Sequence, residues 1–264
     1  IRGLVGSEMC IRDRFYYCFS CGAGGNSLKF LMELKRQSFS DVVMELARRY
    51  SLPVETLDAN QQERLRQQLS RRDQLHRVLS LASGWFRSRL QAPEGAAALE
   101  YLRQQRGLSA GTIESFELGY APEAWDGLLR HLQQVEGIDP SLMEAAGLVV
   151  PRKGGNGFYD RFRHRLMVPI HDRQGRIIGF GGRSLDGSEP KYLNSPETEV
   201  FDKGKNLYGF DKAADAIRRA DCALVVEGYF DVIALHAAGV RHAVAALGTA
   251  MSAQQITQLC PVSY

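Results

Sequence analysis

The sequence predicts a mixed α+β chain made of several small units, and three observations support this prediction. A Cys-x-x-Cys pair followed by glycines, at Cys18 and Cys21, indicates a small turn-rich unit near the start of the chain. Apolar residues at helical spacing dominate residues 73–150, whereas residues 159–180 have the pattern of a β-hairpin. Residues 222–259 then show the order strand, helix, strand, helix that is typical of an α/β unit.

Composition sets broad limits on the kind of protein. The chain has 264 residues, of which 44% are hydrophobic and 24% charged, enough for one good core and a smaller unit. Its apolar runs are shorter than a membrane span. The five cysteines, two of them in Cys-x-x-Cys, suit a reducing compartment better than a disulfide framework, so we expect a cytoplasmic protein without membrane partners.

Both ends of the chain contain unusual amino-acid sequences. Glu8–Asp13 resembles a translated sequencing adapter, and Pro261–Tyr264 resembles the reverse complement of the same adapter. We therefore expect residues 1–14 and 261–264 to be adapter-derived, and the native part to span about Phe15–Cys260.

Residues 15–54 are predicted to form part of a zinc-binding unit. Cys18 and Cys21 have the spacing of half of a tetrahedral zinc site, and the glycines that follow would let the backbone turn around a metal. The same spacing also occurs in redox pairs and in unbound thiols. Two thiolates do not fill four positions, so we expect this chain to bind zinc poorly. Residues 55–72, rich in Gln, Arg and Asp, are expected to be a solvated helical linker.

Residues 73–150 are predicted to be mainly helical, and most of their aromatic side chains are expected to be structural. One stripe at helical spacing should face the core: Leu75, Val78, Leu79 and Ala82. We expect Phe116 and Tyr120 to be core aromatics rather than platforms for base stacking. Trp125 and His131 are assigned to packing or to the surface.

The positive charge is concentrated in residues 151–183, which hold eight Lys or Arg against two Asp. Arg161 and Arg163 lie two residues apart in the first arm of the expected hairpin, so their side chains should point to the same face. Such a row suits a phosphodiester backbone, because guanidinium groups bind phosphate oxygens bidentately. The alternative is a solvated edge strand whose charges discourage aggregation.

A short apolar run, 223–226, is followed by Glu227 and Gly228, and helical spacing then continues to Gly239. This pattern predicts a buried parallel strand with a carboxylate at its carboxyl end, where open α/β sheets bind ligands. The alternative is that Glu227 only caps the helix.

Several sequence segments, in the same order along the chain, resemble motifs of bacterial replicative primases of the DnaG type. Together they cover roughly Phe15–Leu259. Leu224–His236 is similar to the first motif of the Toprim fold in that family, and Phe15–Glu33 is similar to the second half of its zinc ribbon. Three further segments resemble core motifs of the family: residues 178–184, 190–198 and 201–210.

The resemblance implies template-directed joining of ribonucleoside triphosphates into a short RNA primer on single-stranded DNA. It makes Glu227 the catalytic carboxylate of a site for Mg²⁺ or Mn²⁺, and Cys18 and Cys21 two of four Zn²⁺ ligands. Five basic residues would line the groove for template and nucleotide: Arg161, Arg163, Arg183, Lys191 and Lys203. Asp231, within the helix, is expected to be structural. Asn194, Ser195 and Thr198 could position a nucleotide or only hold their loop.

The resemblance also implies a domain order: a partial zinc-binding domain at 15–54, the linker, a catalytic-core N-terminal subdomain at 73–215, and a truncated Toprim subdomain at 216–260. The family's remaining zinc ligands and its Asp-x-Asp metal ligands are expected outside this sequence, so we expect the chain to bind single-stranded DNA weakly and to make no primer. A replicative helicase would be the parent protein's partner, through a C-terminal domain. Two alternatives stay open, the primase half of a phage-type primase–helicase and a non-catalytic DNA-binding relic.

Overall fold

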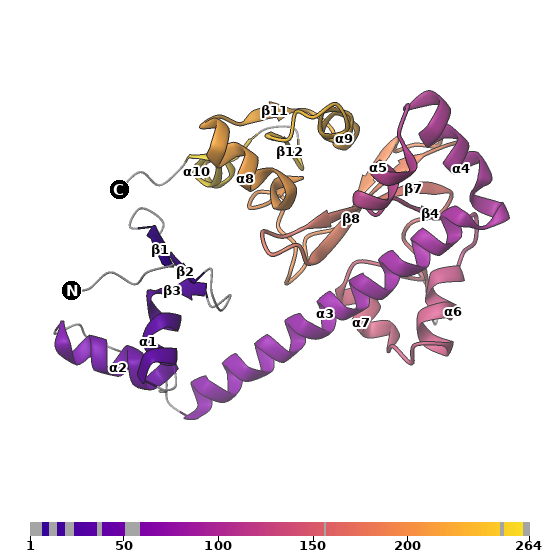
Figure 1. The fold of residues 1–264 in the computed structure, drawn as a ribbon. Coiled ribbons are helices and arrows are strands. Elements are labelled where there is room, and N and C mark those ends of the chain that lie inside the picture. Colours follow the sequence, from indigo (N-terminus) through magenta and orange to yellow (C-terminus); the bar gives the residue numbers. More distant parts are fainter. Residues whose placement is uncertain are drawn as a thin grey trace. The chain divides into compact units, whose positions relative to one another are not determined.

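The computed structural model describes residues 7–10, 15–18, 24–35, 39–50, 59–155, 157–248 and 251–260. The chain divides into two compact units, residues 1–64 with 262–264, and residues 65–261, and each is described by itself (Figure 1).

The first unit combines a small antiparallel sheet with two helices. The sheet has the order β1-β2-β3, and its strands are β1 (Ser7–Cys10), β2 (Phe15–Cys18) and β3 (Gly24–Asn26). The helices are α1 (Ser27–Lys35) and α2 (Phe39–Arg49). Val42 and Ala47 of α2 are buried, so they lie on the packing side of this helix. Strand β1 lies within the segment that we expected to be adapter-derived.

The second unit contains most of the regular structure. Its helices are α3 (Ala59–Gln91), the 3₁₀ turn η1 (Pro93–Gly95), α4 (Ala96–Glu100), the π-helix η2 (Tyr101–Gln105), α5 (Ala110–Ser115), α6 (Gly127–Gln134), α7 (Pro140–Ala145), α8 (Phe210–Ala220), α9 (Tyr229–Ala237) and α10 (Ala253–Leu259). Its strands are β4 (Gly119–Ala121), β5 (Val149–Pro151), β6 (Phe158–Asp160), β7 (Arg165–His171), β8 (Ile177–Ser184), β9 (Tyr192–Asn194), β10 (Leu207–Tyr208), β11 (Leu224–Val226) and β12 (Ala243–Ala246). Among the helices described, none is long and apolar enough to cross a membrane.

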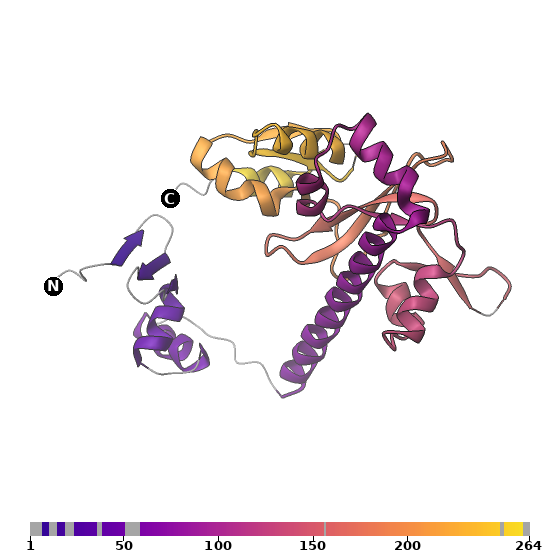
Figure 2. The same ribbon diagram turned by 45° about the vertical axis from the view of Figure 1, so that its right-hand side comes forward.

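An antiparallel sheet of order β4-β7-β8-β9 forms the centre of this unit, and α3 packs along it (Figure 2). All residues of β7 are buried. The predicted stripe of α3 is confirmed as core, since Leu75, Val78 and Leu79 are fully buried. The Phe86 ring of α3 packs edge-on against Phe180 of β8, with the centroids 5.3 Å apart. The predicted linker is helical from Ala59 and continues into this stripe without a break.

The α/β unit that follows has a three-stranded sheet of order β10-β12-β11, in which β11 and β12 are parallel and β10 is antiparallel to β12. Helix α10 begins at a capping box formed by Ser252 and Gln255. The prediction of a buried strand at 223–226 is wrong, because Leu224 and Val225 are each 39% exposed. Within the described residues, β11 is an edge strand that pairs with β12 alone.

The glycines of β8 allow other parts of the chain to approach the sheet closely. A Cβ added at Gly181 would lie 2.5 Å from the Tyr229 ring, and one at Gly182 would lie 3.0 Å from the Phe162 ring. The run Gly179–Gly182 therefore serves close packing, and it lies within a strand rather than before a helix.

We expect Gly181→Ala to destabilise the chain by about 1–3 kcal/mol, because the new methyl group must displace the buried Tyr229 ring. Gly84→Ala is the matched control, since a Cβ at Gly84 of α3 meets nothing within 4 Å. That control should be neutral or stabilise by up to about 1 kcal/mol through helix propensity. The measurement is the thermal unfolding midpoint of both variants, and a Gly181→Ala midpoint equal to that of the parent would contradict the packing argument.

The His236 side chain makes stability depend on pH. Its Nε2 donates to the Ala243 carbonyl oxygen at 2.9 Å. Burial lowers the pKa of the imidazole, aided by Arg241 and Lys212 and opposed by the Ala243 hydrogen bond and by Asp211. As the pH falls below about 6.5, the unfolded chain takes up this proton before the folded chain does, so stability is lost. In His236→Gln the unfolding midpoint should fall less than in the parent between pH 7.5 and 5.5. Identical pH dependence in both proteins would contradict this prediction.

Candidate nucleic-acid interface

Arg161 and Arg163 lie in the connection between β6 and β7, and both line a cavity of about 390 Å³. The prediction that they alternate along a strand is wrong, because β6 ends at Asp160 and β7 begins at Arg165. They nevertheless face the same cavity. Its other lining residues come from the β4–α6 connection (Glu123, Ala124 and Trp125), from the end of the β6–β7 connection and the start of β7 (His164 and Arg165), and from the β8–β9 loop and β9 (Asp186, Ser188, Glu189, Pro190 and Leu193).

Asp160 fixes the backbone of the β6–β7 connection, which carries Arg161 and Arg163. Its buried carboxylate accepts hydrogen bonds from the backbone N–H groups of Leu128 at 2.8 Å and Leu129 at 2.9 Å, in the first turn of α6. Its own N–H donates to the Trp125 carbonyl oxygen at 2.7 Å. Burial raises the pKa of Asp160 to about 6, against the two backbone hydrogen bonds, which favour the charged form. The connection is therefore held to the start of α6.

Trp125 is the main residue of the cavity that the sequence did not single out. Its side chain is 61% exposed, and the Arg163 guanidinium lies 4.4 Å from the centroid of its ring and 5.2 Å from that of Tyr159. We had assigned Trp125 to packing or to the surface. The exposed side chain agrees with a surface position, and an exposed indole beside a guanidinium is also a combination that can stack with a base and bind its phosphate.

Arg183 of β8 lies among aromatic rings. Its guanidinium is 5.3 Å from the ring centroid of Tyr101, 5.2 Å from that of Tyr192 and 6.0 Å from that of Phe230. The Tyr192 hydroxyl accepts a hydrogen bond from it, while its Nε is buried without a partner among the described residues. A second guanidinium, that of Arg106, lies 4.7 Å from the Phe230 centroid. Sequence reasoning did not single out Arg106, since it follows a helical stripe and belongs to no basic run.

The predicted lysines are less closely tied to this cluster. Lys191 is exposed and precedes Tyr192 in the chain, so it borders the Arg183 cluster. Lys203 lies in the β9–β10 connection, where its backbone carbonyl accepts from Gln255 of α10 at 2.8 Å. Among the residues that the structure describes, neither ammonium group forms an ion pair, and neither lines the cavity of Arg161 and Arg163.

Of the three polar residues left open by the sequence, two hold the loop. The Ser195 hydroxyl, fully buried, accepts from the Phe180 N–H at 2.9 Å, and the Thr198 hydroxyl accepts from the Phe201 N–H at 3.1 Å. These bonds use the acceptor oxygens for backbone donors, as in other loops closed by hydroxyl groups.

Glu227 follows β11 directly, at the carboxyl end of the strand, as the sequence predicts. Its side chain is exposed, and α9 begins two residues later at Tyr229. The first turn of α9 is capped by Asp231, whose carboxylate accepts from the Gly228 N–H at 3.1 Å. Asp231 therefore has the structural contact that we expected, and the helix cap does not need Glu227.

Asn194 joins the basic cavity to the segment that carries Glu227. Its side-chain oxygen accepts from the Tyr229 hydroxyl at 2.6 Å, and its amide donates to the Leu247 carbonyl oxygen at 3.3 Å. Its backbone carbonyl accepts from the Arg161 guanidinium at 3.1 Å. Burial lowers the pKa of Arg161 and raises that of the Tyr229 hydroxyl. One side chain thus connects β9 with α9 and with the end of β12.

We expect the Asn194–Tyr229 pair to be energetically coupled. Asn194→Ala leaves the buried Tyr229 hydroxyl without its acceptor and should cost about 1–3 kcal/mol. The double variant Asn194→Ala/Tyr229→Phe should lose less stability than the sum of the losses in the two single variants. The difference, the coupling energy, should be about 0.5–3 kcal/mol. The measurement is a double-mutant cycle by chemical denaturation, and strict additivity would contradict a direct bond.

The metal ligands that the sequence suggested are only partly within the described residues. The backbone of Cys18 ends β2, and Cys21 lies outside the described residues. In the described part of the chain, no three His, Cys, Asp or Glu side chains come together as a metal site would need. Glu227 alone does not fit a divalent cation, and no step is assigned to a metal here. The expected weak zinc binding stays a prediction.

The architecture places the chain among Toprim-containing proteins of the mixed α+β class. The family model described as "DNA primase catalytic core, N-terminal domain" matches residues 85–214. Those described as "CHC2 zinc finger" and "Toprim domain" match residues 8–62 and 221–261. The chain belongs to the bacterial DnaG-type DNA primase family, which confirms the family resemblance and the α+β fold class.

Comparison with individual relatives supports the same family assignment. The chain is 61% identical over 246 residues to the DNA primase of Synechococcus elongatus, covering 93% of this chain and 35% of that protein. It is 41% identical over 246 residues to the DNA primase of Escherichia coli K12, covering 93% of this chain and 42% of that protein. The chain thus spans between a third and a half of the length of these relatives. The matches do not favour a phage-type primase–helicase or a non-catalytic relic.

Solved structures show the same fold. A DnaG primase catalytic domain bound to single-stranded DNA superposes with a TM-score of 0.65 at 41% identity, covering 72% of this chain and 59% of that one. The RNA polymerase domain of Mycobacterium tuberculosis DnaG gives a TM-score of 0.66 at 40% identity, covering 71% of this chain and 60% of that one.

Proposed function

We propose that this chain carries the template-binding part of a DNA primase. The complete protein would be a nucleotidyltransferase that joins ribonucleoside triphosphates into a short RNA primer on a single-stranded DNA template during replication. The observation that carries the proposal is the cavity where Arg161, Arg163 and Trp125 meet, linked through Asn194 to the segment of Glu227. The DNA-bound relative supports the same ligand.

The cavity has the two chemical elements that bind a single strand. The guanidinium groups of Arg161 and Arg163 can each bind a phosphate oxygen, which supplies salt-dependent affinity without sequence preference. The exposed face of Trp125 can stack with a base, a contact that tolerates every base. Arg161 is already bound to the Asn194 carbonyl oxygen, so its position does not depend on the ligand.

The second cluster suits the incoming nucleotide. Arg183 keeps an unpartnered Nε, and its guanidinium is held by aromatic faces rather than by a carboxylate, so its positive charge stays available to phosphate. Lys191 borders this cluster and Lys203 lies in the following loop. We assign these three residues to nucleotide or backbone contacts, and Glu227 to the catalytic carboxylate of the complete protein.

Further properties of the complete protein are proposed on the same basis. The match to the zinc-finger family supports a zinc site to which Cys18 and Cys21 contribute, and the Toprim match supports Mg²⁺ or Mn²⁺ as cofactor. The replication role implied by the named relatives supports a cytoplasmic location and a replicative helicase as partner.

We expect Trp125→Ala to weaken binding of an oligothymidylate by about 1–2 kcal/mol, roughly 5- to 30-fold, through lost stacking. The slope of log affinity against log salt should stay unchanged, because no charge is removed. Arg163→Ala should weaken binding and also reduce that slope by about 0.7, one phosphate contact. Fluorescence anisotropy over a range of salt concentrations measures both quantities.

Arg218→Ala is the matched control, since Arg218 lies on α8 in an exposed ion pair with Asp215 and carries the same charge. It should leave the affinity unchanged. Equal losses in Arg163→Ala and Arg218→Ala would show that net charge, rather than this cavity, binds the strand, and the proposal would fail.

A further inference from the structure

A second, larger cavity lies among the helices of the unit that spans residues 65–261, apart from the basic cavity. Its volume is about 480 Å³, within the range of small-molecule sites. It is lined by residues of α3, α4, η2, α5 and the α5–β4 connection, and it shares no lining residue with the cavity of Arg161 and Arg163.

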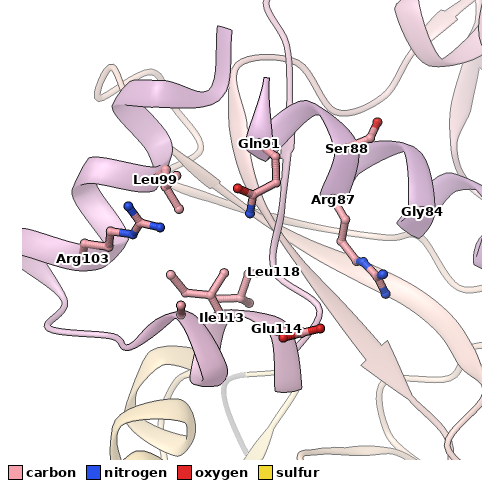
Figure 3. A pocket seen from close by; sticks show the side chains of 10 residues that line it. Gly84, Arg87, Ser88, Gln91, Leu99, Arg103, Ile113, Glu114 and Leu118 are labelled. Carbon is pink, nitrogen blue, oxygen red and sulfur yellow. The ribbon is translucent and has the colours of Figure 1, made fainter. Parts of the chain in front are cut away.

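The lining separates into an apolar floor and a polar rim. Figure 3 shows Leu99, Ile113 and Leu118 grouped together, with the Arg103 guanidinium and the Gln91 amide pointing into the space beside them. Within the described residues Arg103 forms no ion pair. A flat apolar group on this floor would therefore have a free guanidinium at one side for an anion.

The opposite side of the rim carries charge of both signs. Arg87 lies 3.8 Å from the Glu117 carboxylate, too far for a hydrogen bond, so its N–H donors remain available. Figure 3 shows the Arg87 guanidinium directed toward the same side as Glu114. The Glu114 carboxylate and the Gln91 oxygen can accept N–H groups from the edge of a purine base.

Gly84 supplies an independent observation. It lies in the interior of α3, where glycine costs about 1 kcal/mol relative to alanine. Packing within the protein does not require it, because an added Cβ would meet no atom within 4 Å. The missing side chain instead leaves the cavity open over the backbone of α3.

We propose that this cavity binds a purine nucleoside monophosphate, with the base on the Leu99–Ile113–Leu118 floor and the phosphate at Arg103. We further infer that occupancy affects the basic cluster through η2. This five-residue π-helix carries Arg103 at the cavity and Tyr101 at the cluster, where the Tyr101 ring contacts Arg183 and its hydroxyl accepts from the Arg106 Nε at 2.7 Å. π-Helical segments are frequent at functional sites.

The test is calorimetric titration of the whole chain with AMP in the absence of divalent metal. We expect one AMP per chain in the parent, and binding at least about tenfold weaker in Arg103→Ala and for adenosine, because each loses the charge-assisted contact. Gly84→Trp should fill the cavity and abolish binding, whereas the matched control Gly84→Ala should bind as the parent does. Arg183→Ala should retain binding, which separates this cavity from the proposed nucleotide contacts of the basic cluster.

The proposal is overturned if Gly84→Trp and Arg103→Ala, both folded by circular dichroism, bind AMP as the parent does, or if Arg183→Ala alone abolishes binding. Should Gly84→Trp not fold, Arg103→Ala decides.

A 5′-phosphorylated RNA trinucleotide serves as a second probe. Tighter binding than that of AMP identifies a strand end as the source of the nucleotide, and weaker binding identifies the free nucleotide. Saturating AMP should change oligothymidylate affinity at least twofold in the parent and not in Gly84→Trp; equal affinities with and without AMP would overturn the coupling through η2.

Discussion

The close approach of Tyr229 to the bare backbone of Gly181 is the contact on which the arrangement of the second unit depends. A side chain at Gly181 would occupy the space of the Tyr229 ring, so α9 could not lie against β8. With the ring in place, the Tyr229 hydroxyl reaches Asn194, and the Asn194 carbonyl oxygen in turn receives Arg161. The segment that carries Glu227 is therefore positioned relative to the basic cavity by van der Waals exclusion and a short chain of hydrogen bonds. A glycine in a strand usually weakens it, and here it permits the contact between two subdomains.

The cationic side chains of the site are held in three different ways. Arg161 is partly buried and donates to a backbone carbonyl, Arg163 lies over an exposed indole, and Arg183 lies among aromatic rings. None of the three is neutralised by a carboxylate within the described residues. This arrangement orients the guanidinium groups and leaves their net charge uncancelled, because ring faces and carbonyl oxygens attract a cation without neutralising it.

Much of the fold could be predicted from local patterns. The stripe of α3 and the strand–Glu227–helix order depend on residues close in the chain, and both are observed. The errors share one cause. The burial of 223–226 and the placement of Arg161 and Arg163 outside a strand depend on which strands pair and where they end, and that is set by distant segments.

The sequence by itself determined the family, the order of the units and the basic residues of the candidate site, because these features depend on residue types and on spacings between residues close in the chain. Only the tertiary structure decided which residues act together. It brought Trp125 beside Arg163, Arg106 beside Phe230, and Asn194 beside Tyr229, pairs separated by 35 to 124 positions in the chain. It also showed that Ser195 and Thr198 use their hydroxyls to hold a loop. Contacts of this kind arise from sheet pairing and close packing between segments far apart in the sequence, for which no single stretch carries a signal.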